Sequence, residues 1–179
     1  MPVFGPAGSG DRLARRLLVP LTVLLAVLVL VFWVLFSPIK ISGDSMLPGL
    51  HHGDRVLVTR GYGTLSRGDV VYMDASALRL GHGGQVVKRV AALPGDTILV
   101  RRGRAVVNGV PENDDIPVRL SEDDVSVAEI TVPADHVYVL GDNRPNSFDS
   151  RFYGPVPLSA VHGRLVFRYT PVTRLGTVD

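Results

Sequence analysis

The chain has 179 residues, a formal net charge of +2 and 20% charged residues, and its length fits one domain with an appended segment. It contains no long basic run, so we do not expect it to bind nucleic acid. Cysteine is absent, which excludes disulfides and zinc–thiolate sites, and the five histidines show no metal-ligand spacing. We therefore expect no metal and no cofactor.

A long apolar segment covers residues 17–36 and contains no charged side chain. As an α-helix it would be about 30 Å long, which is the thickness of the hydrocarbon core of a bilayer. A cleaved secretory signal peptide is the alternative, but its apolar region runs roughly 7–15 residues and ends at a small-x-small site. This segment is longer and ends in Phe36-Ser37-Pro38-Ile39-Lys40. The sequence therefore predicts an uncleaved transmembrane anchor.

Three arginines, Arg12, Arg15 and Arg16, precede the apolar segment closely. Basic residues favour the cytoplasmic side of a membrane span. The first residues are rich in glycine and proline, a composition typical of disorder. We predict a disordered cytoplasmic tail at 1–16, a single-pass anchor at 17–36 and an extracytoplasmic domain at 37–179.

After residue 40 the chain consists of short β-branched runs separated by turn residues, a pattern typical of strands. Asn108-Gly109 favours a type I′ turn that closes a hairpin over 101–113, and the acidic segment 114–124 is predicted to be a surface loop. No convincing amphipathic helix follows the anchor. We predict a mainly β fold, with an antiparallel sheet or pseudo-barrel as the catalytic domain. The predicted strands are 55–59, 69–72, 86–90, 97–100, 105–107, 129–132, 136–140 and 163–169.

A turn-forming run, Ile41-Ser-Gly-Asp-Ser-Met-Leu-Pro-Gly49, follows the anchor and presents Ser45 as a candidate nucleophile. A serine hydroxyl is a weak nucleophile and needs a neighbouring base. Histidine is the usual base, but His51 and His52 lie outside any extended strand that would fix their geometry. Taken alone, the run is also compatible with an ordinary turn.

The alternative base is Lys88, one of only two lysines among 19 lysines and arginines. Lysine can lose its proton where arginine cannot, and burial lowers its intrinsic pKa of about 10.4. The flanking residues Val86, Val87 and Val90 supply apolar surroundings, while Arg89 is expected on the opposite face of the strand. The competing interpretation is a strand lysine whose stem snorkels to solvent.

A polar run, Gly-Asp-Asn-Arg-Pro-Asn-Ser-Phe-Asp-Ser-Arg, covers 141–151. A neutral lysine needs an orienting partner, and the hydroxyl of Ser147 can accept a hydrogen bond from it. Asp149 and Arg151 can pair and stiffen the loop that presents Ser147. A polar loop held by Asx turns is the competing interpretation.

Four segments, 42–48, 53–58, 88–96 and 141–151, resemble in this order the motif blocks of type I bacterial signal peptidases. The resemblance covers nearly all of the domain after the anchor, and the short single-anchor chain looks like the Gram-positive-type enzymes. It implies a serine endopeptidase that removes signal peptides of the Ala-x-Ala type at the outer face of the bacterial plasma membrane. Its implied partners are signal-peptide-bearing preproteins and the lipid bilayer.

Residue by residue, the resemblance makes Ser45 the nucleophile and Lys88 the general base. Ser147 would orient the lysine, with Asp149 and Arg151 supporting that loop. Small substrate side chains imply shallow apolar pockets. The expected pocket residues are Ile39, Ile41, Met46, Leu50 and Val87, although each is equally compatible with a place in the core.

One feature of the motif concerns the oxyanion hole. Some family members carry a hydroxyl residue two positions before the nucleophile, whereas this chain has Gly43 there. We therefore expect the hole to rely on the backbone N–H of Ser45. The run Ala75-Ser76-Ala77 is itself of the Ala-x-Ala type, so self-nicking is expected if it is exposed.

Three other functions compete with this one. A self-cleaving regulator of the SOS-repressor type uses similar Ser–Lys chemistry, but the anchor and the lack of a DNA-binding helix pair argue against it. A specialised pilin or conjugation peptidase would share the same chemistry. An anchored β-domain that binds wall or partner proteins would need no catalysis at all.

Overall fold

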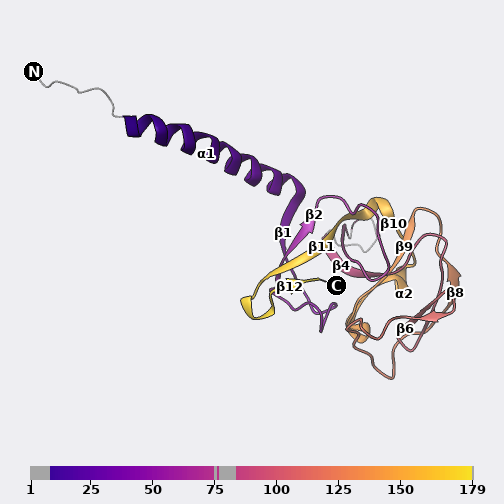
Figure 1. Ribbon diagram of the computed structural model, residues 1–179. Coiled ribbons are helices and arrows are strands. Elements are labelled where there is room, and N and C mark those ends of the chain that lie inside the picture. The colour runs from indigo at the N-terminus through magenta and orange to yellow at the C-terminus, as the bar shows by residue number, and fades with distance from the viewer. Residues whose placement is uncertain (1–8, 75, 77–83, 179) are drawn as a thin grey trace, which may run out of the picture. The chain divides into compact units, whose positions relative to one another are not determined.

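The computed structural model describes residues 9–74, 76 and 84–178 (Figure 1). The suggested self-nicking site at 75–77 lies outside the described residues, apart from Ser76. The chain divides into two compact units, Met1–Phe36 and Ser37–Asp179.

Helix α1, Ser9–Leu35, makes up the described part of the first unit with the exception of Phe36. Its segment Ala14–Leu35 is long and apolar enough to cross a membrane, with a mean hydropathy of 3.0 and no part buried against protein. Thr22 donates from Oγ1 to carbonyls of the preceding turn, so its polar group is satisfied inside the helix. The prediction of a disordered tail is wrong for residues 9–16. Leucine, alanine and arginine favour helix there, and an existing helix extends at low entropic cost.

The second unit is built on an eight-stranded sheet with the order β1-β2-β11-β3-β4-β9-β10, and β12 pairs with β11. The pairings from β2 through β10 are all antiparallel. Figure 1 shows the yellow C-terminal strand β11 beside β2, far earlier in the chain. The strands are β1 (Phe36–Lys40), β2 (Arg55–Thr59), β3 (Val70–Asp74), β4 (Gln85–Ala92), β9 (His136–Leu140), β10 (Val156–Pro157), β11 (Val161–Thr170) and β12 (Gly176–Thr177).

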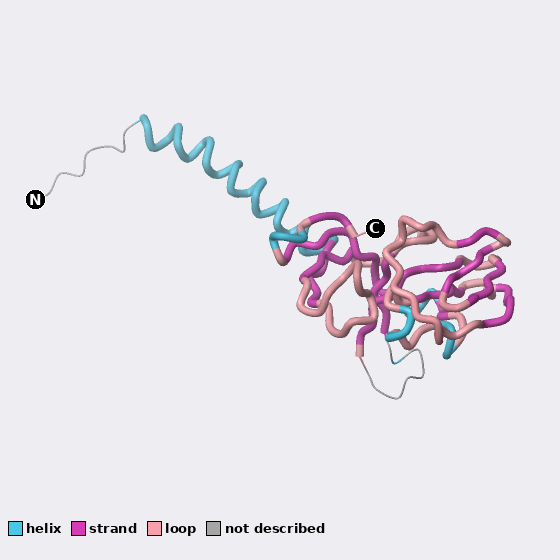
Figure 2. The backbone as a smooth tube through the Cα atoms, turned by 90° about the horizontal axis from the view of Figure 1, so that it is seen from below, coloured by secondary structure: helices cyan, strands magenta, loops and turns pink. Residues whose placement is uncertain are grey.

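A second sheet has four strands in the order β7-β6-β5-β8, and the two groups of strands can be followed in Figure 2. Asn108 and Gly109 join β6 to β7 with φ angles of +52° and +79°, as a type I′ turn requires. The predicted hairpin is therefore confirmed. The strands are β5 (Thr97–Arg101), β6 (Arg104–Val107), β7 (Val110–Pro111) and β8 (Val127–Thr131).

The predicted mainly β antiparallel fold is confirmed, and each predicted strand overlaps an observed one. The predicted strands did not include β1, β10 or β12, and β7 was predicted only as the second arm of the hairpin. Of these, β1, β7 and β10 each contain a proline and lie at the edge of a sheet. Proline has no N–H to donate to a neighbouring strand, so it is tolerated at a sheet edge. The β-branched runs of these strands are also too short to be predicted as strands. The described helices after the anchor are short: α2 (Ser150–Tyr153), η2 (Arg144–Asn146), η3 (Leu158–Ala160) and η4 (Val172–Arg174).

Apolar side chains on both faces of the large sheet are buried. On β3, Val71 and Met73 belong to one apolar cluster, whereas Val70 belongs to another, against which Tyr72 also packs. The second cluster also contains Met46 and Leu50, which come from the turn that carries Ser45. That turn is therefore attached to the core through its apolar side chains.

Candidate active site

Ser45 lies in a tight turn with a largely fixed backbone. The side chain of its neighbour Met46 is in the core, at 2% exposure, while Ser45 is half-buried. The N–H of Leu47 donates to the carbonyl of Asp44 at 3.2 Å and closes the turn. Gly43 has a φ of +86°, a left-handed conformation in which a side chain would be strained. The backbone thus accounts for glycine two positions before Ser45.

Lys88 lies in the middle of β4 and is only 4% exposed. Alternation along the strand places Val86 and Val90 on its face, and Val87 on the other face, where it packs with a different cluster. The expectation that Val87 surrounds the lysine is therefore corrected. Arg89 also points away from Lys88, as predicted from the same alternation.

The pKa of Lys88 is lowered to about 8. Burial is the largest cause, because taking an ammonium out of water disfavours its charged form. Among nearby charges, Asp149 and Asp142 raise the pKa and Arg151 lowers it, with Asp149 the largest of the three. All three lie in the 141–151 segment, so the lysine is close to the polar loop.

The 141–151 loop is held together by a buried carboxylate. Asp149 accepts from Arg151 Nε at 2.8 Å and from the N–H of Gly141 at 3.0 Å, and neither charged side chain is more than 1% exposed. Arg151 donates in turn to the carbonyl of Ser147 at 3.2 Å. The predicted Asp149–Arg151 pair is present, and it ties the two ends of the loop together.

One acidic residue of the 114–124 segment also belongs to this cluster. Asp124 lies 3.8 Å from Arg151, and its side chain is 2% exposed. The prediction of a surface loop is therefore wrong for Asp124, because the buried guanidinium supplies it with a counterion.

Gly141 is where the lysine strand meets the polar loop. In the pairing of β4 with β9, Arg89 lies opposite Leu140. Gly141 follows Leu140 directly, so it adjoins the end of β4 that carries Lys88.

The serine turn reaches the same glycine. A Cβ at Gly141 would lie 2.6 Å from the carbonyl oxygen of Ser45 and would collide with the Ser147 hydroxyl. Only glycine allows the two backbones to approach so closely. Ser45 and Ser147 therefore both lie against Gly141, the residue that directly follows the strand paired with β4.

The five expected pocket residues gather in one apolar cluster. Ile41, Met46 and Leu50 are 2–3% exposed and so fill the core, which was the alternative interpretation. Ile39 and Val87 pack against the cluster but remain partly exposed. Of the five, these two keep surface that a substrate side chain can contact.

The two histidines near the serine turn are exposed. His51 donates from its backbone N–H to Asp54 at 2.9 Å. His52 accepts the N–H of Gly43 at Nδ1, at 3.2 Å, so it contacts the turn beside Ser45.

No role was predicted for Asp142, Asn143 and Arg144, but in the structure each of them binds another segment of the chain. Asp142 forms a buried ion pair with Arg89, and Arg144 forms one with Glu112. Asn143 binds the serine turn. The density of charged and amide groups in this short run was the available signal.

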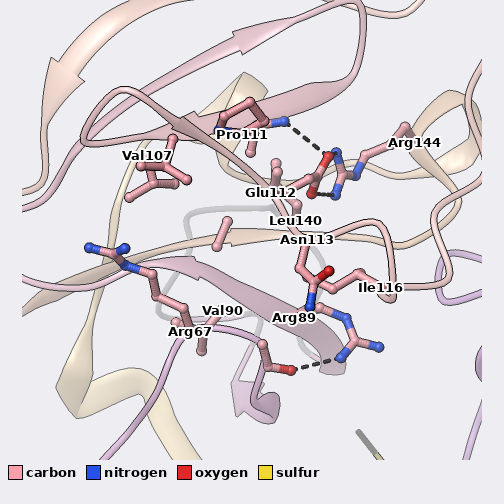
Figure 3. A pocket seen from close by; sticks show the side chains of 14 residues that line it. Arg67, Arg89, Val90, Val107, Pro111, Glu112, Asn113, Ile116, Leu140 and Arg144 are labelled. Carbon is pink, nitrogen blue, oxygen red and sulfur yellow. Dashed lines mark hydrogen bonds and ion pairs between the residues drawn. The ribbon is translucent and has the colours of Figure 1, made fainter.

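A cavity of about 210 Å³ lies near the loop, lined by apolar side chains that include Val107, Ile116 and Leu140. Figure 3 shows Arg89 and Arg144 at its wall, with Arg144 paired to Glu112. Neither Ser45 nor Lys88 lines this cavity, so it is separate from the predicted catalytic pair.

A serine on a fixed turn and a buried lysine beside the same loop define a candidate serine hydrolase site on a β-rich domain. The chain matches the family model described as signal peptidase, peptidase S26, over residues 14–170. It is similar to signal peptidase I of Leptolyngbya laminosa, with 40% identity over 143 residues, which is 76% of this chain and 70% of that protein. It is also similar to signal peptidase I of Bacillus licheniformis, with 32% identity over 174 residues and 89% of each chain.

Among solved structures, a signal peptidase I from Enterococcus faecalis is 30% identical, with a TM-score of 0.47 over 59% of this chain and 99% of that chain. The chain belongs to the signal peptidase family, peptidase S26. It is a serine peptidase of the type that removes signal peptides from exported preproteins, and the family is anchored in membranes. The resemblance to type I bacterial signal peptidases is confirmed.

Proposed function

We propose that this enzyme cleaves signal peptides with Ser45 as the nucleophile and the neutral amine of Lys88 as the general base. The observation that carries the proposal is Lys88, which is 4% exposed and has a pKa lowered to about 8. Near pH 7.4 about one molecule in five then holds a neutral amine, against about one in a thousand for an exposed lysine. The mechanism needs no metal and no cofactor.

The reaction is an acyl transfer in two stages. Lys88 takes the proton of the Ser45 hydroxyl, and Oγ attacks the carbonyl carbon of the scissile peptide. The oxygen that becomes negative accepts the backbone N–H of Ser45. Lys88 then returns the proton to the leaving amine, and water, deprotonated by Lys88, frees the acyl group from Ser45.

Ser147 is proposed to orient Lys88. Its hydroxyl is buried and has no hydrogen-bond partner among the described residues. A buried hydroxyl without a partner is unfavourable, and a hydrogen bond from the Lys88 amine satisfies it. Asp149 and Arg151 act indirectly, because Arg151 holds the carbonyl of Ser147.

The edge of β4 supports an extended substrate. Strand β9 pairs with β4 from Arg89 onward, so the N–H and C=O groups of Val87 that point away from β3 have no strand partner among the described residues. A substrate strand can add there, with its small side chains against Ile39 and Val87. We propose Ala-x-Ala as the preferred sequence. The core behind Ile39 and Val87 is filled, so the space over these two side chains is shallow and suits small substrate side chains.

The membrane placement is also a proposal. The arginines before α1 favour a cytoplasmic N-terminus, which puts the 37–179 domain outside the plasma membrane. The anchor then confines the active site to the membrane face at which the apolar part of a signal peptide emerges. The enzyme's partners are the preproteins and the lipid bilayer.

Incubation of a preprotein with the full-length enzyme in lipid vesicles tests the function. Wild type is expected to release the signal peptide after Ala-x-Ala, and Ser45→Ala is expected to release none. Self-cleavage without preprotein cleavage would favour a self-cleaving regulator. Absence of both would favour a non-catalytic anchored domain.

A further inference from the structure

Asn143 makes two hydrogen bonds to consecutive peptide groups of the serine turn. Its backbone N–H donates to the carbonyl of Ser45 at 2.9 Å, and its side-chain Nδ2 donates to the carbonyl of Asp44, also at 2.9 Å. Asn143 is 4% exposed, so water competes little for these bonds. The residue therefore holds both peptide groups that flank the α-carbon of Ser45.

The side-chain bond fixes more than the carbonyl that it touches. The peptide group between Asp44 and Ser45 is planar, so the carbonyl of Asp44 and the N–H of Ser45 point in opposite directions. A hydrogen bond that fixes the direction of the Asp44 carbonyl therefore also fixes the direction of the Ser45 N–H. Since Asp44 also accepts from Leu47 at 3.2 Å, both lone pairs of that carbonyl are used.

The N–H that is aimed in this way is unoccupied. Among the described residues, no protein group accepts a hydrogen bond from the N–H of Ser45. Elsewhere in the turn, the N–H of Leu47 is bound to Asp44 and that of Gly43 is bound to His52. The N–H groups of Asp44 and Met46, like that of Ser45, have no acceptor in the described part of the chain. A free, oriented donor at the nucleophile itself is what an oxyanion hole requires.

Asn143 is itself held rigidly. Arg119 donates to the carbonyl of Asp142 at 2.8 Å and accepts from the N–H of Arg144 at 3.0 Å, so both peptide groups around Asn143 are bound to one residue of another segment. The carbonyl of Asn143 accepts from Asn146 at 2.9 Å. The amide of Asn143 is thus presented from a fixed backbone rather than from a mobile loop.

We propose that Asn143 is a positioning residue, which directs the N–H of Ser45 toward the oxyanion of the transition state. The inference rests on the proposed function, because it takes Ser45 as the nucleophile. Asn143 forms and breaks no covalent bond and does not touch the substrate. By donating to the same peptide group it also polarises the N–H that stabilises the oxyanion.

Asn143→Ala removes the side-chain donor and keeps the backbone bond to Ser45. We expect kcat for a preprotein to fall about 10- to 100-fold, less than the 10²- to 10³-fold of losing an oxyanion donor outright, because the N–H remains but is no longer aimed. KM should stay within about 2-fold. The rising limb of the pH profile, which follows the deprotonation of Lys88, should not move, because Lys88 keeps its surroundings. Asn146→Ala, an exposed asparagine on the same loop, is the matched control and should behave as wild type.

A pair of inhibitors separates positioning from a general loosening of the site. A peptide aldehyde ending in Ala-x-Ala forms a tetrahedral adduct with Ser45, whereas the matching peptide alcohol only occupies the site. In Asn143→Ala the inhibition constant of the aldehyde should rise at least about 10-fold, in step with the fall in kcat. That of the alcohol should not change. Equal weakening of both inhibitors, or an unchanged kcat, would overturn the inference.

Two further variants keep the test decisive. Asn143→Asp preserves size but cannot donate, so it should lose activity at least as strongly as Asn143→Ala, and it serves if the alanine variant unfolds. If Ser45→Ala still cleaves, the proposed function itself has failed. If Ser45→Ala is inactive while both Asn143 variants match wild type, only the role of Asn143 has failed.

Discussion

Two neighbouring basic side chains of strand β4, Lys88 and Arg89, are buried on opposite faces of the strand, and they differ in their charged partners. Lys88 and Arg89 are each 4% exposed. Arg89 forms a two-pronged ion pair with Asp142, at 2.9 and 2.8 Å, and donates to the carbonyl of Gly68 at 2.7 Å. No carboxylate forms an ion pair with Lys88 among the described residues.

The difference shows how one strand can hold a permanent cation next to the lysine that is proposed as the base. Arg89 keeps its charge because guanidinium does not deprotonate in proteins and a carboxylate neutralises it. Lys88 lacks such a partner, so burial lowers its pKa to about 8 instead. The contrast predicts that the two residues respond oppositely to substitution.

The largest effect is expected for Lys88→Arg, which makes both faces of β4 carry a permanent cation. Arginine cannot serve as a base, so cleavage of a preprotein should fall about 10³-fold or more although the protein still folds. Circular dichroism checks the fold. The reverse swap, Arg89→Lys, leaves the base in place and should retain measurable cleavage. Substantial activity in Lys88→Arg would contradict the Ser–Lys mechanism.

Arg89→Met should destabilise the domain by about 3–5 kcal/mol, because it leaves the fully buried carboxylate of Asp142 without a counterion. Urea unfolding measures the free energy. The matched control is Arg104→Met, which removes an exposed pair with Asp114 and should change stability by less than about 1 kcal/mol. An equal loss of unfolding free energy in the two variants would mean that burial does not determine how much each ion pair contributes to stability.

Lys88→Met should have the opposite sign and stabilise the domain by on the order of 3 kcal/mol at pH 7, since it removes an ammonium that burial disfavours. The folded-state pKa is lowered, so the unfolded chain binds more protons between about pH 8 and 10.5, and the destabilising contribution of Lys88 fades across that window. The gain should therefore be full below pH 8 and shrink above it. A gain that does not change with pH would exclude the lysine charge as its cause.

In the unmodified enzyme, kcat/KM should rise about 50-fold from pH 6 to pH 8 and then level off, because the neutral fraction of Lys88 follows a pKa of about 8. The rate of peptide cleavage across this range is the measurement. His52→Ala should keep the same limb, although His52 contacts the serine turn. Loss of the limb in that variant would assign the base to His52 instead.

Most of the fold was accessible from sequence because it depends on neighbouring residues. Strands 55–59 and 136–140 were predicted with their observed bounds, since β-branched runs between turn residues are a local signal. The edge strands were not, because proline removes that signal while the sheet edge still tolerates it. The start of α1 at Ser9 was missed because helix extends beyond the apolar segment that nucleates it.

In the candidate site, too, contacts between residues close in the sequence were predictable and long-range contacts were not. The Asp149–Arg151 pair was predictable because its partners are two residues apart. The Arg89–Asp142 pair spans 53 residues, and the bond from Asn143 to Asp44 spans 99, so no local pattern announces them. The expected pocket residues show most clearly what the sequence cannot predict. Alternation along the chain would turn Ile39 and Ile41 to the same side, yet Ile41 is buried and Ile39 is partly exposed.

By itself, the sequence determined an apolar segment long enough to cross a membrane, a β-rich domain, and a serine and lysine in ordered motif blocks. These follow from residue type, spacing and periodicity along the chain. Only the tertiary structure decided which face of β4 holds Lys88, how far its pKa falls, and that the serine turn approaches Ser147 at Gly141. Desolvation and long-range contact depend on packing between segments that are distant in the chain, which no local pattern records.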